Sequence, residues 1–139
     1  MTRPPVRTPA ELYAHAIAIE REAAERYAEL AQFMADLGND EVAALFRTLA
    51  VYEAEHLDTL EARTAGIALP QLGPGEYAWL DAAAPETVAR ELVFRLLTPR
   101  HALAIALDAE RRAQRFFADV RASAQDPALR ALAQEMALE

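Results

Sequence analysis

The chain has 139 residues, 14 basic and 22 acidic side chains, a formal net charge of −8, and a hydrophobic content of 53%. This is the length of one domain, and a chain of this size buries about 68% of its unfolded surface in a single core. Cysteine and lysine are absent, which excludes thiol catalysis, disulfides, cysteine-ligated metals and Schiff-base chemistry. Ser123 is the only serine and has no histidine near it in sequence, so a serine hydrolase is disfavoured.

The charge distribution argues against a nucleic-acid partner, and the lack of long apolar runs argues against a membrane. The negative net charge repels phosphate backbones, and the arginines are spread among acids rather than gathered in a basic stripe. No run of about 18 apolar residues exists, and the first residues lack the apolar core of a signal peptide. We therefore expect a cytoplasmic protein with neither a nucleic-acid nor a membrane partner.

Alanine, leucine, glutamate and arginine dominate the composition, which predicts an all-α fold. Residues 8–11 (Thr-Pro-Ala-Glu) combine an N-cap, a proline and a capping-box glutamate, and nothing breaks the helix that follows before Gly38. Asn39 or Asp40 can cap a second helix that runs to about Thr64. These two segments predict a helical hairpin.

A second hairpin is predicted after a long crossover. Residues 64–98 hold the turn-rich segment of the chain, and a short helix is expected within them at 85–97. Residues 98–99 (Thr-Pro) repeat the first start signal, so a third long helix should run to about Ala124. Residues 126–127 (Asp-Pro) then begin a fourth helix.

The predicted architecture is a flexible leader over residues 1–8 and a single four-helix up-down bundle over residues 9–139. The last helix is expected to be truncated, with only about 20 Å formed when the given sequence stops. A helix of this length cannot cover neighbours about twice as long. We therefore expect a homo-oligomer, at least a dimer, in which a second subunit or a longer tail covers the remaining apolar surface.

Charged residues interrupt the apolar seams of the long helices. Spacings of three and four give the first helix a core seam with Glu20 as its only charged member: Tyr13, Ala16, Glu20, Ala23, Tyr27, Leu30, Met34 and Leu37. The third helix has Glu110 at the same place: Leu103, Ala106, Glu110, Ala113, Phe117 and Val120. The second helix carries a Glu-x-x-His within its stripe: Phe46, Leu49, Glu53, His56 and Leu60.

The first and third helices form a weak internal repeat. Its members fall at corresponding positions of the two helices: Ala14, Ala16, Glu20, Arg21, Ala23 and Ala28, and then Ala104, Ala106, Glu110, Arg111, Ala113 and Ala118. Matching alanines mean little in helices so rich in alanine. The matching position of Glu20 and Glu110 within the apolar pattern is what makes the repeat informative.

Three glutamates and one histidine facing a core need a common partner. An ionised carboxylate in apolar surroundings takes up a proton unless something compensates its charge. Metal-binding bundles place one Glu on each of two helices and a Glu-x-x-His on each of the other two. The positions of Glu20, Glu53, His56 and Glu110 therefore indicate a metal site.

Simpler interpretations exist for each residue taken alone. The segment 53–56 could be a solvated helix face, His56 a core histidine with a satisfied hydrogen bond, and Glu20 or Glu110 half of a buried Glu–Arg pair. None of these explains the coincidence of all four. His15 and His101 lie outside the seams and are expected at the surface or an interface. Tyr27 and Tyr52 are most simply core residues, and the Tyr27 hydroxyl could hydrogen-bond a ligand carboxylate.

Three segments resemble the rubrerythrin-type branch of the ferritin-like diiron-carboxylate superfamily: residues 16–27 (AIAIEREAAERY), residues 49–56 (LAVYEAEH) and the Glu-x6-aromatic unit from Glu110 to Phe117. The resemblance covers nearly the whole chain from residue 9. It implies a ferritin-like up-down bundle with a long crossover between its second and third helices. It also implies a carboxylate-bridged di-iron or mixed-metal site with oxidase or peroxide-reducing chemistry.

Carried over by position, the resemblance implies that Glu20 and Glu53 are ligands, with Glu53 bridging two metal ions. His56 would bind one ion and Glu110 would serve the other. Oxygen and nitrogen ligands suit iron, with manganese or zinc as alternatives. Without cysteine there is no rubredoxin-like iron centre, so an external electron donor is required.

The chain departs from the family at two positions. Ala113 stands where rubrerythrins carry an additional glutamate, which puts their redox-linked ligand exchange in doubt here. Aligning the second helix on the fourth places Met136, rather than Glu135, in the core seam. The ligand of the fourth helix then falls just beyond Glu139, with its histidine three positions further, so we expect the natural chain to continue.

The leading expectation is a dinuclear iron oxidoreductase that reduces peroxide or oxygen. The same site could instead serve a ferroxidase or an iron-storage protein. A non-catalytic helical scaffold with a degenerate metal site is the rival from another class, supported by the incomplete fourth helix.

Overall fold

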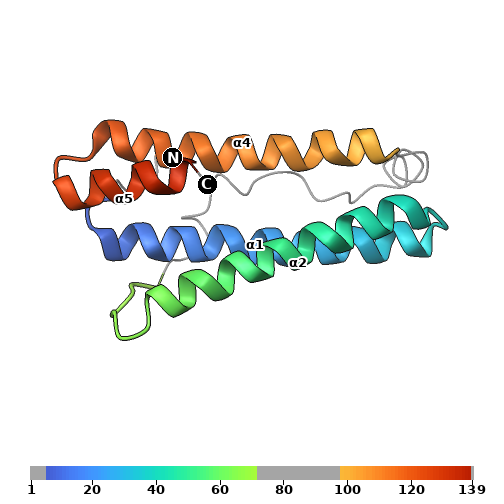
Figure 1. The fold of residues 1–139 in the computed structure, drawn as a ribbon, viewed down its shortest axis with the longest axis horizontal. Coiled ribbons are helices and arrows are strands. Elements are labelled where there is room, and N and C mark those ends of the chain that lie inside the picture. Colours follow the sequence, from blue (N-terminus) through green and yellow to red (C-terminus); the bar gives the residue numbers. More distant parts are fainter. Residues whose placement is uncertain (1–5, 72–97, 139) are drawn as a thin grey trace.

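The computed structural model describes residues 6–71 and 98–138 of the chain. Within them the chain forms four helices and no strand, labelled as in Figure 1: α1 (Pro9–Asp36), α2 (Asp40–Arg63), α4 (Pro99–Ser123) and α5 (Pro127–Leu138). The all-α bundle is thereby confirmed. None of these helices has both the length and the apolar character that a bilayer crossing requires.

The first hairpin starts and turns at the predicted residues. The Thr8 hydroxyl accepts a hydrogen bond from the Glu11 amide at 3.1 Å, and Pro9 occupies the first turn of α1. Gly38 has a φ of 81°, a left-handed conformation that ends the helix at little steric cost. The Asn39 side chain then caps α2 by accepting from the Val42 amide at 3.4 Å.

The second hairpin uses the same local signals. The Thr98 hydroxyl accepts from the His101 amide at 3.2 Å and starts α4. The Asp126 side chain accepts from the Ala128 amide at 3.1 Å at the start of α5. The short helix expected at 85–97 lies outside the described residues, as do residues 1–5 of the expected leader; Val6 packs against the core.

The two hairpins enclose two apolar clusters along the length of the bundle. One joins the first half of α1 and the last turns of α2 to the end of α4 and to α5: Leu12, Ala16, Ile17, Ile19, Leu60, Phe116, Phe117, Val120, Ala124, Leu129, Leu132, Ala133 and Met136. The other joins α1 and α2 near their turn to the start of α4: Tyr27, Leu30, Ala31, Met34, Val42, Ala43, Phe46, Ala102 and Ala106. In Figure 1 α5 runs beside only the C-terminal part of α4, so it covers the first cluster and not the second.

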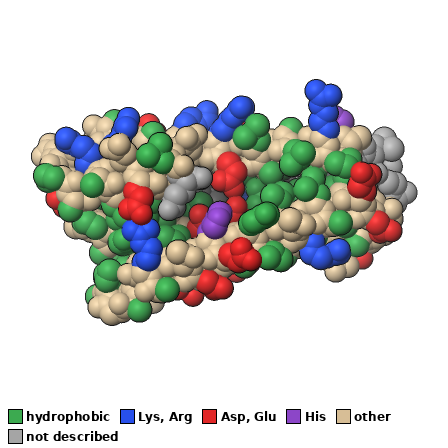
Figure 2. All heavy atoms as spheres, in the orientation of Figure 1, with side chains coloured by type: hydrophobic (Ala, Val, Ile, Leu, Met, Phe, Trp, Pro, Cys, Tyr) green, Lys and Arg blue, Asp and Glu red, His purple; other side chains and the backbone are tan. Residues whose placement is uncertain are grey.

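Two hydrophobic residues expected in the core lie at the surface, and so do His56 and Glu110, which were also expected to face the core. Tyr52 on α2 is 56% exposed and Leu103 on α4 is 52% exposed. Figure 2 shows hydrophobic side chains on the open face between α4 and the α1/α2 hairpin. Helical spacing identifies the side of a helix on which a residue lies, but burial also needs a neighbouring element, and α5 does not reach Leu103.

Candidate metal centre

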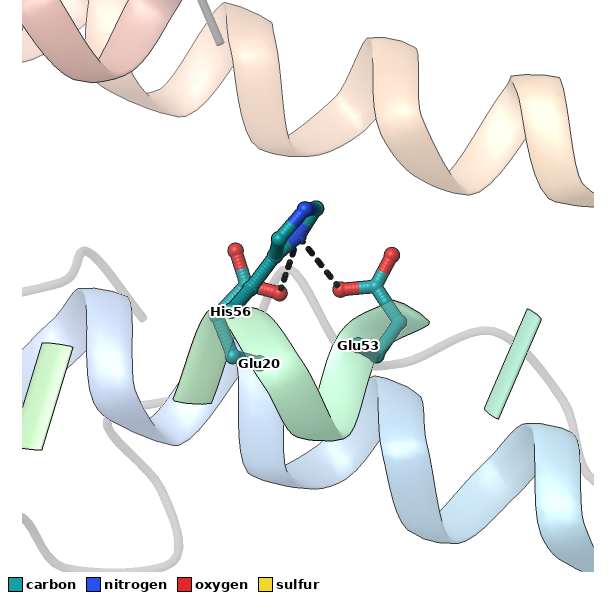
Figure 3. Close-up of side chains that lie close together, drawn as sticks. All are labelled: Glu20, Glu53 and His56. Atoms are coloured by element: carbon teal, nitrogen blue, oxygen red, sulfur yellow. Dashed lines mark ion pairs between the residues drawn. The ribbon is translucent and has the colours of Figure 1, made fainter. Parts of the chain in front are cut away.

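Glu20, Glu53 and His56 meet in the gap between the two apolar clusters. Glu20 comes from the middle of α1, and Glu53 and His56 lie three residues apart on α2, where helical geometry puts them on one face. All three side chains point toward α4 in Figure 3. The Glu53 side chain is 8% exposed, whereas that of His56 is 59% exposed and forms the solvent edge of the cluster.

The spacing of these three side chains fits a bound metal ion. The His56 Nδ1 atom lies 3.7 Å from Glu20 Oε2 and 3.7 Å from Glu53 Oε2 (Figure 3), and one ligand atom from each residue lies within 4.8 Å of the others. Ligand atoms on bonds of about 2.1 Å, set at tetrahedral to octahedral angles, are separated by roughly 3.0 to 3.5 Å. The two distances from His56 exceed this range by only a few tenths of an ångström, and small side-chain rotations of the glutamates would close the rest of the set on one ion.

Glu110 from α4 joins this cluster from the opposite hairpin. Its carboxyl group lies close enough to that of Glu53 to share a proton with it, and Glu53 stands in the same relation to Glu20. The three carboxyl groups therefore form a continuous chain from α4 through α2 to α1. All four residues predicted from the sequence are brought together by the fold.

Burial and crowding keep protons on this chain of carboxyl groups. Burial, followed by the hydrogen bond with Glu20, raises the pKa of Glu53 to about 7, although the hydrogen bond with Glu110 acts in the opposite direction. Glu110 is exposed as a residue, but neighbouring atoms shield its carboxyl group from water, and this desolvation, the contact with Glu53 and the charge of Glu53 raise its pKa to about 7. Three adjacent carboxylates cannot all ionise in this setting unless cations replace the shared protons.

Tyr27 lies beside the same carboxyl groups. Its side chain is buried and its ring stacks on Phe46 with a centroid separation of 6.1 Å. Burial, and then the charges of Glu110, Glu53 and Glu20, raise the pKa of the Tyr27 hydroxyl above its ordinary value. Tyr27 is therefore a neutral phenol that can donate a hydrogen bond within the site.

The simpler interpretations of the individual residues do not match the structure. Residues 54–56 are exposed, but Glu53 is buried and so does not belong to a solvated face, and His56 is too exposed to be a core histidine. Among the described residues Glu110 forms no ion pair with an arginine. His15, in contrast, was expected at the surface or an interface and is buried, with its ring 5.2 Å from that of Phe116, while His101 is exposed.

A polar cluster that the sequence did not suggest anchors α5. The Arg63 guanidinium at the end of α2 lies 3.0 Å from Glu135 on α5 and donates to the Tyr13 hydroxyl of α1 at 3.2 Å. Contacts between exposed helix positions leave no periodic signal that could have indicated them. In α5, Met136 is buried and Glu135 is exposed. This agrees with the alignment of the second helix on the fourth, which placed Met136 rather than Glu135 in the core seam.

Comparisons with known proteins agree with this arrangement. The sequence model of the rubrerythrin family matches residues 11–139. A solved structure of an uncharacterized conserved protein from Magnetospirillum magnetotacticum MS-1 is 37% identical, covers 94% of this chain and 85% of its own, and superposes with a TM-score of 0.74. No curated protein matches the sequence. With the carboxylate–histidine cluster in place between its helices, the chain belongs to the rubrerythrin family of ferritin-like proteins.

Proposed function

We propose that this protein is a dinuclear metal oxidoreductase that reduces peroxide or oxygen with electrons from an external donor. The observation that carries the proposal is the chain of three carboxyl groups from Glu110 through Glu53 to Glu20, with His56 at its edge. Buried carboxyl groups that must share protons are costly to retain unless they have a ligand to hold.

The donor set suits two ions of iron. Glu20, Glu53 and His56 would hold one ion, while Glu53 would bridge to a second that Glu110 also binds. The three carboxylates would carry a charge of −3 and two divalent cations a charge of +4, so the carboxylates would neutralise most of the charge of the ions. Oxygen and nitrogen donors without sulfur also accept manganese or zinc, because geometry and supply rather than affinity decide which metal is bound.

Bound metal would supply the electron-transfer and Lewis-acid chemistry of peroxide reduction. The residues supply a site with one accessible side. Glu53 and Tyr27 form its buried wall, while His56 and Glu110 are exposed. Figure 2 shows a histidine and acidic side chains at the surface between α4 and the α1/α2 hairpin, where a small reactant can enter.

Protons are also available at this site. Glu53 and Glu110 must release theirs when cations bind, because only deprotonated carboxylates are ligands. The Tyr27 hydroxyl retains its proton beside them and can orient a ligand carboxylate. Electrons must come from another protein or a small reductant, since the chain has no cysteine to hold an iron–sulfur or rubredoxin-like centre.

Metal analysis of the purified protein tests the site. We expect about two metal ions per chain in the parent and a loss of metal in Glu53→Ala and His56→Ala. Glu55→Ala is the matched control, because Glu55 lies between the two proposed ligands but faces solvent, and it should keep the parent metal content. A parent protein that takes up no metal from an iron, manganese or zinc solution would favour a structural scaffold.

A turnover assay distinguishes peroxide reduction from ferroxidase activity and iron storage. Protein loaded with ferrous iron under anaerobic conditions should consume peroxide catalytically when a reductant is supplied. A ferroxidase would instead oxidise further added ferrous iron and retain the product beyond two ions per chain. Retention of iron in large excess, without reductant-dependent peroxide consumption, would overturn the oxidoreductase proposal in favour of iron storage.

A further inference from the structure

Apolar side chains of α2 and α4 lead along the surface to the accessible side of the metal centre. On α4, Leu103, Leu107 and Glu110 are spaced by four and three residues, which places them on one side of the helix. On α2 the same kind of spacing joins His56 to three apolar residues: Leu45, Leu49 and Tyr52. The five apolar residues form a strip, called the apolar strip below, and each of its two rows ends at a residue of the metal centre.

Packing between α2 and α4 brings the two rows next to each other. Phe46 of α2 and Ala102 and Ala106 of α4 belong to the same buried cluster, and the two leucines of α2 are partly buried against it. The two leucines of α4 and Tyr52 are each about half exposed. Because α5 covers only the other cluster, the strip faces solvent on the open side of the bundle in Figure 2.

The length and charge of the apolar strip suit a small neutral organic group. Seven residues separate Leu103 from Glu110, which is a rise of about 10 Å along α4. Neither row holds a charged side chain before it reaches the metal centre. The carboxyl groups at its inner end and the net charge of −8 disfavour an anion. A neutral aryl or short alkyl group therefore fits the strip, and a fatty-acid carboxylate does not.

The position of the apolar strip favours a reactant as its occupant. The strip ends at His56 and Glu110, the exposed residues through which a small reactant reaches the metal centre. A helix packed over the strip would close this approach, whereas a reactant with an apolar part would use the strip and the metal centre together. Contact with the strip removes apolar surface of the reactant from water, which stabilises the bound state.

We infer that the substrate of this site is a neutral organic hydroperoxide, whose peroxide group reaches the metal centre while its aryl or alkyl group lies on the apolar strip. The inference rests on the proposed function, because it names the substrate class of that reaction. Reduction of R–O–O–H breaks the O–O bond and yields R–OH and water. It consumes two protons and two electrons, which a one-electron donor such as a reduced iron–sulfur protein supplies in two transfers. Hydrogen peroxide has no group that can contact the strip.

Binding of a product alcohol tests the apolar strip without any turnover. We expect 2-phenyl-2-propanol, the alcohol formed from cumene hydroperoxide, to bind saturably to the full-length, metal-free protein in a titration followed by NMR. Leu103→Gln and Leu107→Gln should each weaken this binding about tenfold, since the loss of one apolar contact in such a site costs a factor of about ten or more.

Ile105→Gln is the matched control. Ile105 is 38% exposed on the same helix but stands two residues from each leucine, or about 200° around α4, so this variant should bind the alcohol like the parent. All three substitutions are on an exposed helix surface, and circular dichroism verifies that the fold is kept. Absence of saturable binding to the parent, or equal weakening by Ile105→Gln, would overturn the inference.

Steady-state kinetics of the metal-loaded protein tests the substrate class. With one donor throughout, the ratio of kcat/KM for cumene hydroperoxide to kcat/KM for hydrogen peroxide should fall about tenfold in Leu103→Gln and in Leu107→Gln and stay at the parent value in Ile105→Gln. Comparing ratios between variants cancels the difference in intrinsic reactivity of the two peroxides. An unchanged ratio in both leucine variants would overturn this inference alone, whereas a parent that reduces neither peroxide would overturn the proposed function.

Discussion

Glu53 connects the two halves of the carboxyl chain and is its most buried member. A carboxyl group whose pKa is about 7 in the folded chain and about 4.3 in the unfolded chain binds more protons when folded between these values. The free energy of unfolding of the metal-free protein must therefore fall as the pH rises through this interval. This is the opposite of the usual behaviour of a paired carboxylate.

We expect the metal-free protein to be less stable at pH 8 than at pH 5 by roughly 2 to 3 kcal/mol from Glu53 alone. Urea unfolding in the presence of a chelator at the two pH values measures this difference. Glu53→Gln, which keeps the size and polarity but cannot ionise, should remove most of it. An equal pH dependence in the parent and in Glu53→Gln would mean that Glu53 is ionised normally in the folded state.

Tyr27 allows a sharper test of the surroundings of the site. Tyr27→Phe should retain the fold, because the ring that stacks on Phe46 remains, while removing the hydroxyl beside the carboxyl groups. Loss of a group that orients metal ligands commonly costs 10- to 100-fold in metal affinity, and we expect about tenfold or more here. Metal titration followed by calorimetry measures the change.

Tyr13→Phe is the matched control, because Tyr13 lies near the start of α1 and contacts Arg63 rather than the metal centre. Its metal affinity should equal that of the parent. If both tyrosine variants bind metal like the parent, the Tyr27 hydroxyl takes no part in the site.

For single residues, the sequence predicted which side chains come together better than it predicted how exposed they are. The positions of Glu20, Glu53 and Glu110 follow from helical periodicity, which identifies the inward side of a helix without any tertiary information. The exposure of Tyr52 and His56 and the burial of His15 depend on which other element lies opposite. The sharing of protons among the carboxyl groups likewise depends on distances between helices.

The helices themselves begin at sequence signals that act locally. Thr8 and Thr98, each followed by proline, cap α1 and α4 through the same contact between the hydroxyl and the amide three residues later. Helix bounds could therefore be predicted almost to the residue. The pairing of Arg63 with Glu135 could not, because it depends on how α5 is rotated against α2.

The cap of α4 can be tested alone. Thr98→Ala removes the acceptor for the His101 amide and should lower the free energy of unfolding by about 1 kcal/mol. Thr48→Ala is the same change in the middle of α2, where the hydroxyl bonds to the Ala44 carbonyl, and it should be neutral or slightly stabilising because alanine favours helix. Equal effects of the two variants in chemical unfolding would contradict the assigned cap.

In the molecule as a whole, the candidate metal centre lies between two apolar clusters and draws its residues from both hairpins. Glu20, Glu53 and His56 belong to the α1/α2 hairpin and Glu110 to the α4/α5 hairpin. The internal repeat of the sequence predicted this two-part arrangement. Cations between the hairpins would replace shared protons by bonds across the interface, so metal binding and the association of the two hairpins should be coupled.

This coupling predicts a large effect of metal on thermal stability. Metal at about 100 times its dissociation constant stabilises the state that binds it by about 2.7 kcal/mol, or roughly 10 °C in melting temperature for a domain of this size. Glu110→Ala removes the ligand contributed by α4, so its metal-induced shift should be less than about half that of the parent at the same metal concentration. Asp119→Ala, an exposed acidic residue on the same helix, should keep the full shift. If Glu110→Ala gains as much stability from metal as the parent does, the ions are held by the α1/α2 hairpin alone and do not join the two halves of the bundle.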